Sequence, residues 1–142
     1  MNTYFETSAI VKLVVVEEGS DEAGALWDGS DLVFTSRLAY VEARAALAAA
    51  RRGRRLSPKG LERGKQALEG RFEEVDLIEV TAEIARTASD LAEEHGLRGY
   101  DAVHLASAFA LGAGSVVLVT WDRELAHAAG TVGFHLGGVR VD

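Results

Sequence analysis

The chain has 142 residues, a length typical of one domain with a substantial hydrophobic core. Its 48% of hydrophobic and 26% of charged residues are the balance of a globular protein. The absence of cysteine excludes disulfides, thiol nucleophiles and thiolate zinc sites, and the net charge of −7 argues against broad electrostatic binding to nucleic acid. We expect one domain over residues 1–142.

The N-terminal apolar stretch is short, contains Lys12 and ends in two acidic residues. It has neither the basic leader of a signal peptide nor the length of a membrane span. A chain without cysteine is also compatible with a reducing compartment. We therefore expect a cytoplasmic protein without a membrane segment.

Short apolar segments alternate with amphipathic ones along the chain. Strands are expected at 3–6, 31–35, 75–80 and 115–120, with a last short strand in the tail from 135. Helices are expected at 8–16, 20–27, 36–52, from 58 to at least 72, 81–96, 100–111 and 122–129, with Ser20, Ser36, Ser57 and Thr81 placed to begin four of them. This alternation predicts a three-layer α/β fold with a mainly parallel central sheet.

Four acidic residues stand at widely separated points of this pattern. Ligands of such sheets bind outside the carboxyl ends of the strands, and two of the acids, Glu6 and Asp122, fall at the ends of predicted strands. Clustered carboxylates repel one another unless a cation neutralises them, and the usual cation for an all-oxygen cluster is Mg²⁺ or Mn²⁺. The sequence therefore predicts a divalent-metal site that gathers Glu6, Glu42, Asp101 and Asp122.

Three of these acids also have a structural interpretation. Glu6 is a possible polar strand end, Asp101 is favourable in a first helical turn, and Asp122 is a possible helix N-cap. The helix that begins at Asp101 is apolar nearly all round, which predicts that this acid is buried. Thr120, two residues before Asp122, has a hydroxyl suited to hold a water or a carboxylate.

Glu42 is the most informative of the four. Helical spacing places it on one stripe with Leu38, Ala45, Ala46 and Ala49. No basic residue lies three or four positions away, so an ion or a non-local ion pair must balance its charge.

Two further segments have open interpretations. The positive charges of residues 51–65 either solvate a helix end or contact phosphates or a partner: Arg51, Arg52, Arg54, Arg55, Lys59, Arg63 and Lys65. An apolar set is expected mainly in the core, with a hydrophobic groove for a partner's helix as the alternative: Val14, Val15, Val16, Leu26 and Trp27. The histidines show no metal-ligand spacing. His104, three residues after Asp101, either faces the site or, as we expect, is a packed or surface residue.

Together the segments YFETSAIVKL, RLAYVEARAAL, LRGYDAVHLASA and VLVTWDREL resemble the PIN domain, in particular the toxin ribonucleases of VapBC-type toxin–antitoxin modules. The order and spacing of the four segments agree with that family over essentially the whole chain. The resemblance implies a Mg²⁺- or Mn²⁺-dependent endoribonuclease, a cognate VapB-like antitoxin that covers the active site, and a homodimer.

By position, the resemblance carries over an acidic quartet of Glu6, Glu42, Asp101 and Asp122, with Ser8 and Thr120 as polar support. In such a site the metal activates a water that attacks the phosphodiester, and Asp101 is our choice to orient it. One departure is that the family has aspartate where this chain has Glu6, whose extra methylene suits Mg²⁺ geometry less well. We expect partial metal affinity and a lower rate.

Two rival functions stand beside this one. A receiver or phosphatase of another α/β family would need paired acids after one strand, which YFETS lacks, and no nucleotide-binding or hydrolase motif occurs in the chain. The second rival is a PIN-like module that binds antitoxin and RNA but cleaves weakly or not at all.

Overall fold

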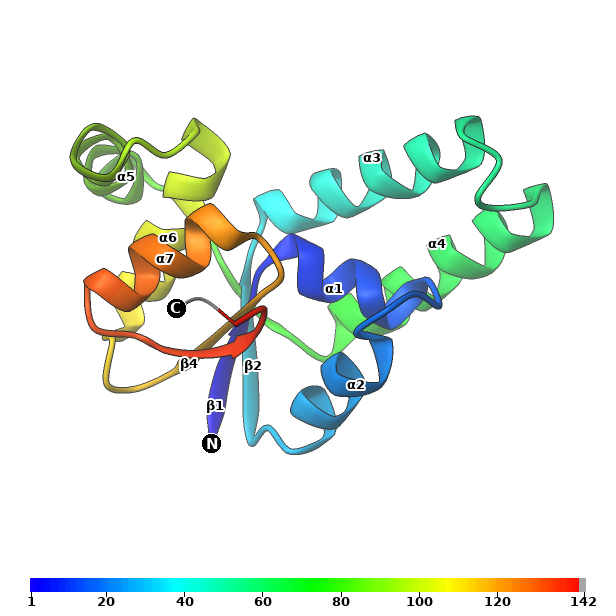
Figure 1. Cartoon of the computed structure of the whole chain (residues 1–142), viewed down its shortest axis with the longest axis horizontal. Coiled ribbons are helices and arrows are strands. Elements are labelled where there is room, and N and C mark those ends of the chain that lie inside the picture. Colours follow the sequence, from blue (N-terminus) through cyan, green and yellow to red (C-terminus); the bar gives the residue numbers. More distant parts are fainter. Residues whose placement is uncertain (141–142) are drawn as a thin grey trace.

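A sheet of five parallel strands runs through the middle of the computed structural model, which describes residues 1–140 (Figure 1). The strand order is β3-β2-β1-β4-β5. Every neighbouring pair is parallel, so the expected parallel sheet is confirmed. The strands are β1 (Asn2–Phe5), β2 (Leu32–Ser36), β3 (Asp76–Ile78), β4 (Val117–Thr120) and β5 (His135–Gly138).

Helices follow the strands and cover both faces of the sheet (Figure 1). Within residues 1–140 they are α1 (Thr7–Val14), α2 (Ser20–Asp28), α3 (Leu38–Arg52), α4 (Pro58–Glu73), α5 (Ala82–His95), α6 (Gly99–Leu111) and α7 (Arg123–Thr131). None of the helices in that range is long and apolar enough to span a bilayer.

Two hydrophobic clusters on opposite faces of the sheet make the three layers. Successive side chains of a strand point to opposite faces, and β1 shows this directly. Tyr4 packs with buried residues of α5, α6 and α7, whereas Phe5 packs with α1, α2, α3 and α4. The three-layer α/β architecture is therefore confirmed.

Several helix starts follow from local chemistry as predicted. The side chains of Ser57, Thr81 and Asp122 each accept a hydrogen bond from a backbone N–H in the first turn of α4, α5 and α7. Ser20 is not the cap of α2, because its hydroxyl donates to Val15 O and accepts from Glu17 N. The cap position of α3 is Arg37 rather than Ser36.

The apolar set before and within α2 lies mainly in the core, as expected. Trp27 is buried against Phe5, and Val14, Val15 and Leu26 pack partly buried on the same cluster. Val16 is the exception, since its side chain is 98% exposed.

Candidate active site

The site lies at the carboxyl edge of the sheet, between β1 and β4. Strand order reverses there, with β2 and β3 on one side of β1 and β4 and β5 on the other. In open α/β sheets such a reversal leaves a crevice where ligands bind. Glu6 directly follows β1 and its N–H donates to Val119 O of β4 at 3.0 Å, while Asp122 follows β4 two residues after Thr120.

Glu6 is held by hydrogen bonds on both carboxylate oxygens. It is the N-cap of α1, and Oε1 accepts from the N–H of Ser8 at 3.0 Å. Oε2 accepts from the Ser8 hydroxyl at 2.5 Å and from the Thr120 hydroxyl at 2.6 Å. A carboxylate offers about four acceptor positions, so these three donors leave about one, on Oε1. Ser8 and Thr120 thus lie beside the acid they were predicted to support.

Asp101 and Asp122 share one cationic partner. Arg98, the N-cap residue of α6, donates from Nε to Asp101 Oδ2 at 3.1 Å and from Nη2 to Asp122 Oδ2 at 3.2 Å. Asp101 is buried as predicted, with 2% of its surface exposed, whereas Arg98 is 57% exposed. The guanidinium therefore bridges the two acids from the solvent side.

Burial and, to a smaller extent, the negative charges of Asp122 and Glu6 together raise the pKa of Asp101 to about 6, against the opposing effect of Arg98. An ordinary aspartate titrates near pH 4. The shift means that three of the four predicted acids interact electrostatically, and that Arg98 alone does not neutralise them.

Glu42 belongs to a different set of contacts. Its Oε1 accepts from the Thr7 hydroxyl at 2.6 Å and lies 2.6 Å from Nε2 of His104. Burial acts to raise the pKa of Glu42, but the hydrogen bonds from His104 and Thr7 outweigh it and lower that pKa. Because Thr7 follows Glu6 in the chain, the Glu42 carboxylate lies next to the cluster without sharing a donor with it.

The predicted stripe on α3 was wrong. The buried face consists of Ala39, Ala43, Leu47 and Ala50, and Glu42 lies at its edge, half-buried. The alternative of a non-local partner was right, since His104 lies 62 residues away in sequence.

Four contributors to the site were missed or given another role by the sequence reasoning: Tyr4, Thr7, Arg98 and His104. Two of them carried a usable signal, because Arg98 and His104 lie three residues before and after Asp101, a spacing that aligns side chains on one helical face. His104 is a packed residue, as expected, but it is hydrogen-bonded on both nitrogens, and Nδ1 lies 2.7 Å from the Tyr4 hydroxyl.

Across residues 1–140, no group of three or more acid, histidine or cysteine side chains is arranged closely enough to hold a metal ion. The donor chemistry nevertheless fits a hard divalent cation, which prefers oxygen ligands. Arg98 places its positive charge between Asp101 and Asp122, and so occupies the position of a cation for that pair.

The α3–α4 hairpin projects away from the sheet, with its connection at the far end (Figure 1). Of the cations near that tip, only Lys65 has a carboxylate partner within residues 1–140, Glu62 at 3.5 Å. Arg54 there adopts a left-handed backbone with φ of 59°. The exposed cations form a patch, called the hairpin patch below, beside the half-buried Arg51: Arg52, Arg54, Arg55, Lys59 and Arg63.

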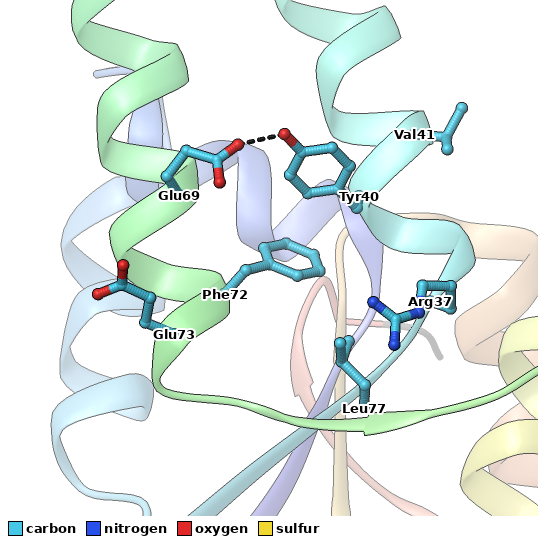
Figure 2. A pocket seen from close by; sticks show the side chains of 7 residues that line it. All are labelled: Arg37, Tyr40, Val41, Glu69, Phe72, Glu73 and Leu77. Carbon is cyan, nitrogen blue, oxygen red and sulfur yellow. Dashed lines mark hydrogen bonds between the residues drawn. The ribbon is translucent and has the colours of Figure 1, made fainter.

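A groove of about 330 Å³ opens at the base of the same hairpin (Figure 2). Tyr40 and Phe72 stack edge to face there, with ring centroids 5.3 Å apart, and the Tyr40 hydroxyl donates to Glu69. Val41, the neighbour of Glu42, is 65% exposed beside the groove. The remaining lining residues are Arg37, Glu73 and Leu77.

The sequence matches known proteins over most of its length. Residues 3–131 match the PIN domain family. Over 130 residues the chain is 49% identical to Ribonuclease VapC49 of Mycobacterium tuberculosis, an alignment that covers 89% of this chain and 90% of the relative. It is 38% identical over 130 residues to Ribonuclease VapC35 of the same organism, covering 89% of this chain and 88% of that one.

Solved structures share the fold at lower identity. VapC20 of Mycobacterium tuberculosis, described as a sarcin-ricin loop cleaving toxin, superimposes with a TM-score of 0.66 at 19% identity, covering 89% of this chain and 94% of that one. VapBC2 of Rickettsia felis, bound to a promoter DNA fragment, gives 0.65 at 15% identity, covering 99% and 100%. From the sequence matches, this chain belongs to the PIN-domain family and, within it, to the VapC group.

Proposed function

We propose that the chain is a Mg²⁺- or Mn²⁺-dependent endoribonuclease, the toxin of a toxin–antitoxin module. The observation that carries the proposal is the charge balance among Asp101, Asp122 and Glu6, at the point where the strand order reverses. Burial, Asp122 and Glu6 raise the pKa of Asp101 to about 6, which marks a site short of positive charge. Membership of the VapC group, whose relatives are ribonucleases by name, gives this site its reaction class.

Asp101, Asp122 and Glu6 are the residues that would hold the cation, and Glu42 would complete the quartet. When bound, a divalent cation lowers the pKa of a water and polarises the scissile phosphate. Arg98 must leave the Asp101–Asp122 pair for the cation to enter, and its 57% exposure allows that movement.

The chain's own groups have distinct tasks in this proposal. The Ser8 and Thr120 hydroxyls fix the Glu6 carboxylate and leave about one acceptor position on it. Asp101 is our choice to orient an attacking water and take its proton. Glu42, with its lowered pKa, stays ionised beside it.

Glu6 is where the site departs from its family's aspartate. The extra methylene lets the carboxylate fold back over the first turn of α1, where Ser8 engages both of its oxygens. We expect this arrangement to keep part of the metal affinity and to lower the rate of cleavage. The idea fails if Glu6→Asp leaves both Mn²⁺ affinity and cleavage rate unchanged.

The test of the function uses antitoxin-free protein and a mixture of structured RNAs, with Mg²⁺, Mn²⁺ or EDTA, beside an Asp101→Asn control. Cutting that needs metal and is lost in the control supports the nuclease. Cutting that appears only in Glu6→Asp identifies an attenuated centre. A protein that binds Mn²⁺ and RNA but cuts in neither form supports the second candidate, a PIN-like binding module, which the three donors on Glu6 favour.

RNA is the proposed substrate, and the hairpin patch is the surface best suited to its backbone. Residues 51–65 carry seven positive charges and one negative charge, in a chain whose net charge is −7. Exposed arginines without carboxylate partners are free to pair with phosphates. We therefore assign phosphate contacts to the hairpin tip, while the RNA sequence that is cut depends on bases at the carboxyl edge.

The antitoxin is the proposed protein partner, since two of the structural neighbours are described as toxin–antitoxin systems. We assign it to the groove of Figure 2, whose exposed Val41 directly precedes Glu42, so that a bound chain would lie beside the site. Val41→Asp should weaken binding of the co-expressed antitoxin and leave RNA cleavage intact. The homodimer and the cytoplasmic location remain predictions.

A further inference from the structure

A buried chain of hydrogen bonds connects β1, α6 and α3 behind the site. His104 has no exposed surface, and neither has Tyr4. The Tyr4 hydroxyl lies 2.7 Å from Nδ1 of His104, and Nε2 lies 2.6 Å from Oε1 of Glu42. We propose that His104 is a positioning residue, which holds Glu42 by one oxygen so that the other faces the reacting RNA; this role rests on the proposed ribonuclease function.

The positions of the protons follow from the partners. An ionised carboxylate only accepts, so the proton between His104 and Glu42 belongs to Nε2. With that proton on Nε2, the Nδ1 of a neutral imidazole is an acceptor, and the Tyr4 hydroxyl, 2.7 Å away, donates to it. A neutral imidazole satisfies all three groups in this arrangement. Tyr4 thereby selects the tautomer of His104 that donates to Glu42.

The contacts on Glu42 are one-sided. The hydroxyl of Thr7 and the ring of His104 both engage Oε1, and within residues 1–140 Oε2 has no hydrogen-bond partner. A free glutamate side chain loses rotamer entropy when it is fixed in one position. Two donors on one oxygen fix it in the folded state, before RNA arrives.

The apolar surroundings support this role over a purely structural one. Tyr4 and His104 pack among the alanine and leucine side chains of the α5–α7 cluster. Phenylalanine and leucine would fill that space without polar atoms to satisfy, and a buried polar pair gives little or no net stability over apolar residues. The polar pair is therefore better explained by its effect on Glu42, whose carboxylate it holds in one position. Partners that orient a functional ligand in this way typically affect activity about 10–100-fold.

Two substitutions separate positioning from packing. The amide nitrogen of glutamine reaches the place of Nε2, so His104→Gln keeps a donor to Glu42. The shorter asparagine of His104→Asn places its amide near the former position of Nδ1 and therefore loses the hydrogen bond to Glu42. We expect His104→Asn to lower kcat about 10–100-fold with KM for RNA changed less than about twofold, and His104→Gln to recover most of that loss.

A double-mutant cycle then tests whether His104 acts through Glu42. In a Glu42→Gln background, His104→Asn should cause little further loss, because the group it positions is already gone. An equal loss of kcat in both backgrounds, or a failure of His104→Gln to recover activity at a melting temperature near that of the original chain, overturns the proposal.

A spectroscopic readout keeps this test independent of the proposed function. Nitrogen NMR of the original chain, ¹⁵N-labelled at histidine and free of metal, should show His104 protonated at Nε2 with slow proton exchange. An unprotonated Nε2 overturns the positioning role even if the protein cuts RNA. A protonated Nε2 in a protein that cuts no RNA supports the hydrogen bond to Glu42 and rejects the ribonuclease function instead.

Discussion

Two sides of the same site treat their carboxylates in opposite ways. On the α3 side, Glu42 receives two hydrogen bonds from Thr7 and buried His104, and its pKa is lowered in spite of burial. On the α6–α7 side, Asp101 has only an exposed arginine against burial and two neighbouring acids, and its pKa is raised to about 6. Hydrogen-bond donors of the protein satisfy Glu42 on the first side, whereas Asp101 and Asp122 on the second side lack positive charge. An added cation is therefore worth most at Asp101 and Asp122.

The largest effect is expected from Asp101→Asn. The amide keeps the shape and can still accept from Arg98, but it removes the charge that a cation would need. Cleavage should fall more than about 100-fold, because the group acts at the reacting centre. Mn²⁺ affinity, measured by calorimetry, should fall by more than tenfold, by roughly 1.4 kcal/mol or more.

Glu42→Gln is the matched control from the other side. It should reduce cleavage while lowering Mn²⁺ affinity clearly less than Asp101→Asn does, because Glu42 is already satisfied by the fold. Equal losses of Mn²⁺ affinity in the two variants would contradict the inference that the cation binds mainly at Asp101 and Asp122.

Arg98→Ala should have the opposite sign on metal binding. Arg98 competes with a cation for Asp101 and Asp122, so its removal should raise Mn²⁺ affinity several-fold, up to about tenfold. Arg37→Ala is the control, since it breaks an exposed ion pair with Glu79 whose loss costs little. Weaker Mn²⁺ binding in Arg98→Ala would mean that the guanidinium supports the metal site rather than occupying it.

The pKa of Asp101 also predicts how stability changes with pH in metal-free protein. The folded state keeps this proton up to about pH 6, and the unfolded chain loses it near about pH 4. The stabilisation is thus complete below about pH 4 and is lost as the pH rises through about 6, by at most about 3 kcal/mol. Urea unfolding at about pH 5 and about pH 7.5 measures roughly half of this loss, and Asp101→Asn should remove this part of the slope.

Added Mn²⁺ separates that effect from other titrations. A bound cation would replace the proton on Asp101, so the loss of stability toward neutral pH should shrink in the original chain and stay unchanged in Asp101→Asn. An unchanged slope in both proteins would count against a cation at Asp101.

Local chemistry was enough to predict most of this architecture. Apolar strands followed by capped helices predicted the parallel α/β class, and Glu6 and Asp122 were placed at the carboxyl edge because each lies at the end of a predicted strand. The face of α3 could not be assigned, since its many alanines give little contrast between buried and exposed sides. The His104–Glu42 contact joins residues 62 positions apart, on helices that belong to the two opposite hydrophobic clusters, so only the assembled fold creates it.

The smallest expected effect comes from the hairpin tip, which carries the charge that the acidic edge lacks. Arg63→Gln and Arg86→Gln remove the same charge from exposed helix positions that have no carboxylate partner within residues 1–140, but only Arg63 belongs to the hairpin patch. RNA affinity should fall a few-fold in Arg63→Gln at low salt, and the slope of log affinity against log salt should decrease by roughly 0.7–1.

Titration of RNA into each variant with EDTA present measures binding without cleavage. The same loss in Arg86→Gln would show that net charge alone attracts RNA, because a position-independent effect needs no contact with the hairpin. A loss confined to Arg63→Gln, with Mn²⁺ affinity unchanged, would separate the two tasks in space. The hairpin would then bind the backbone by exposed charge, while the buried acids at the edge of β1 and β4 act on the bond that is cut.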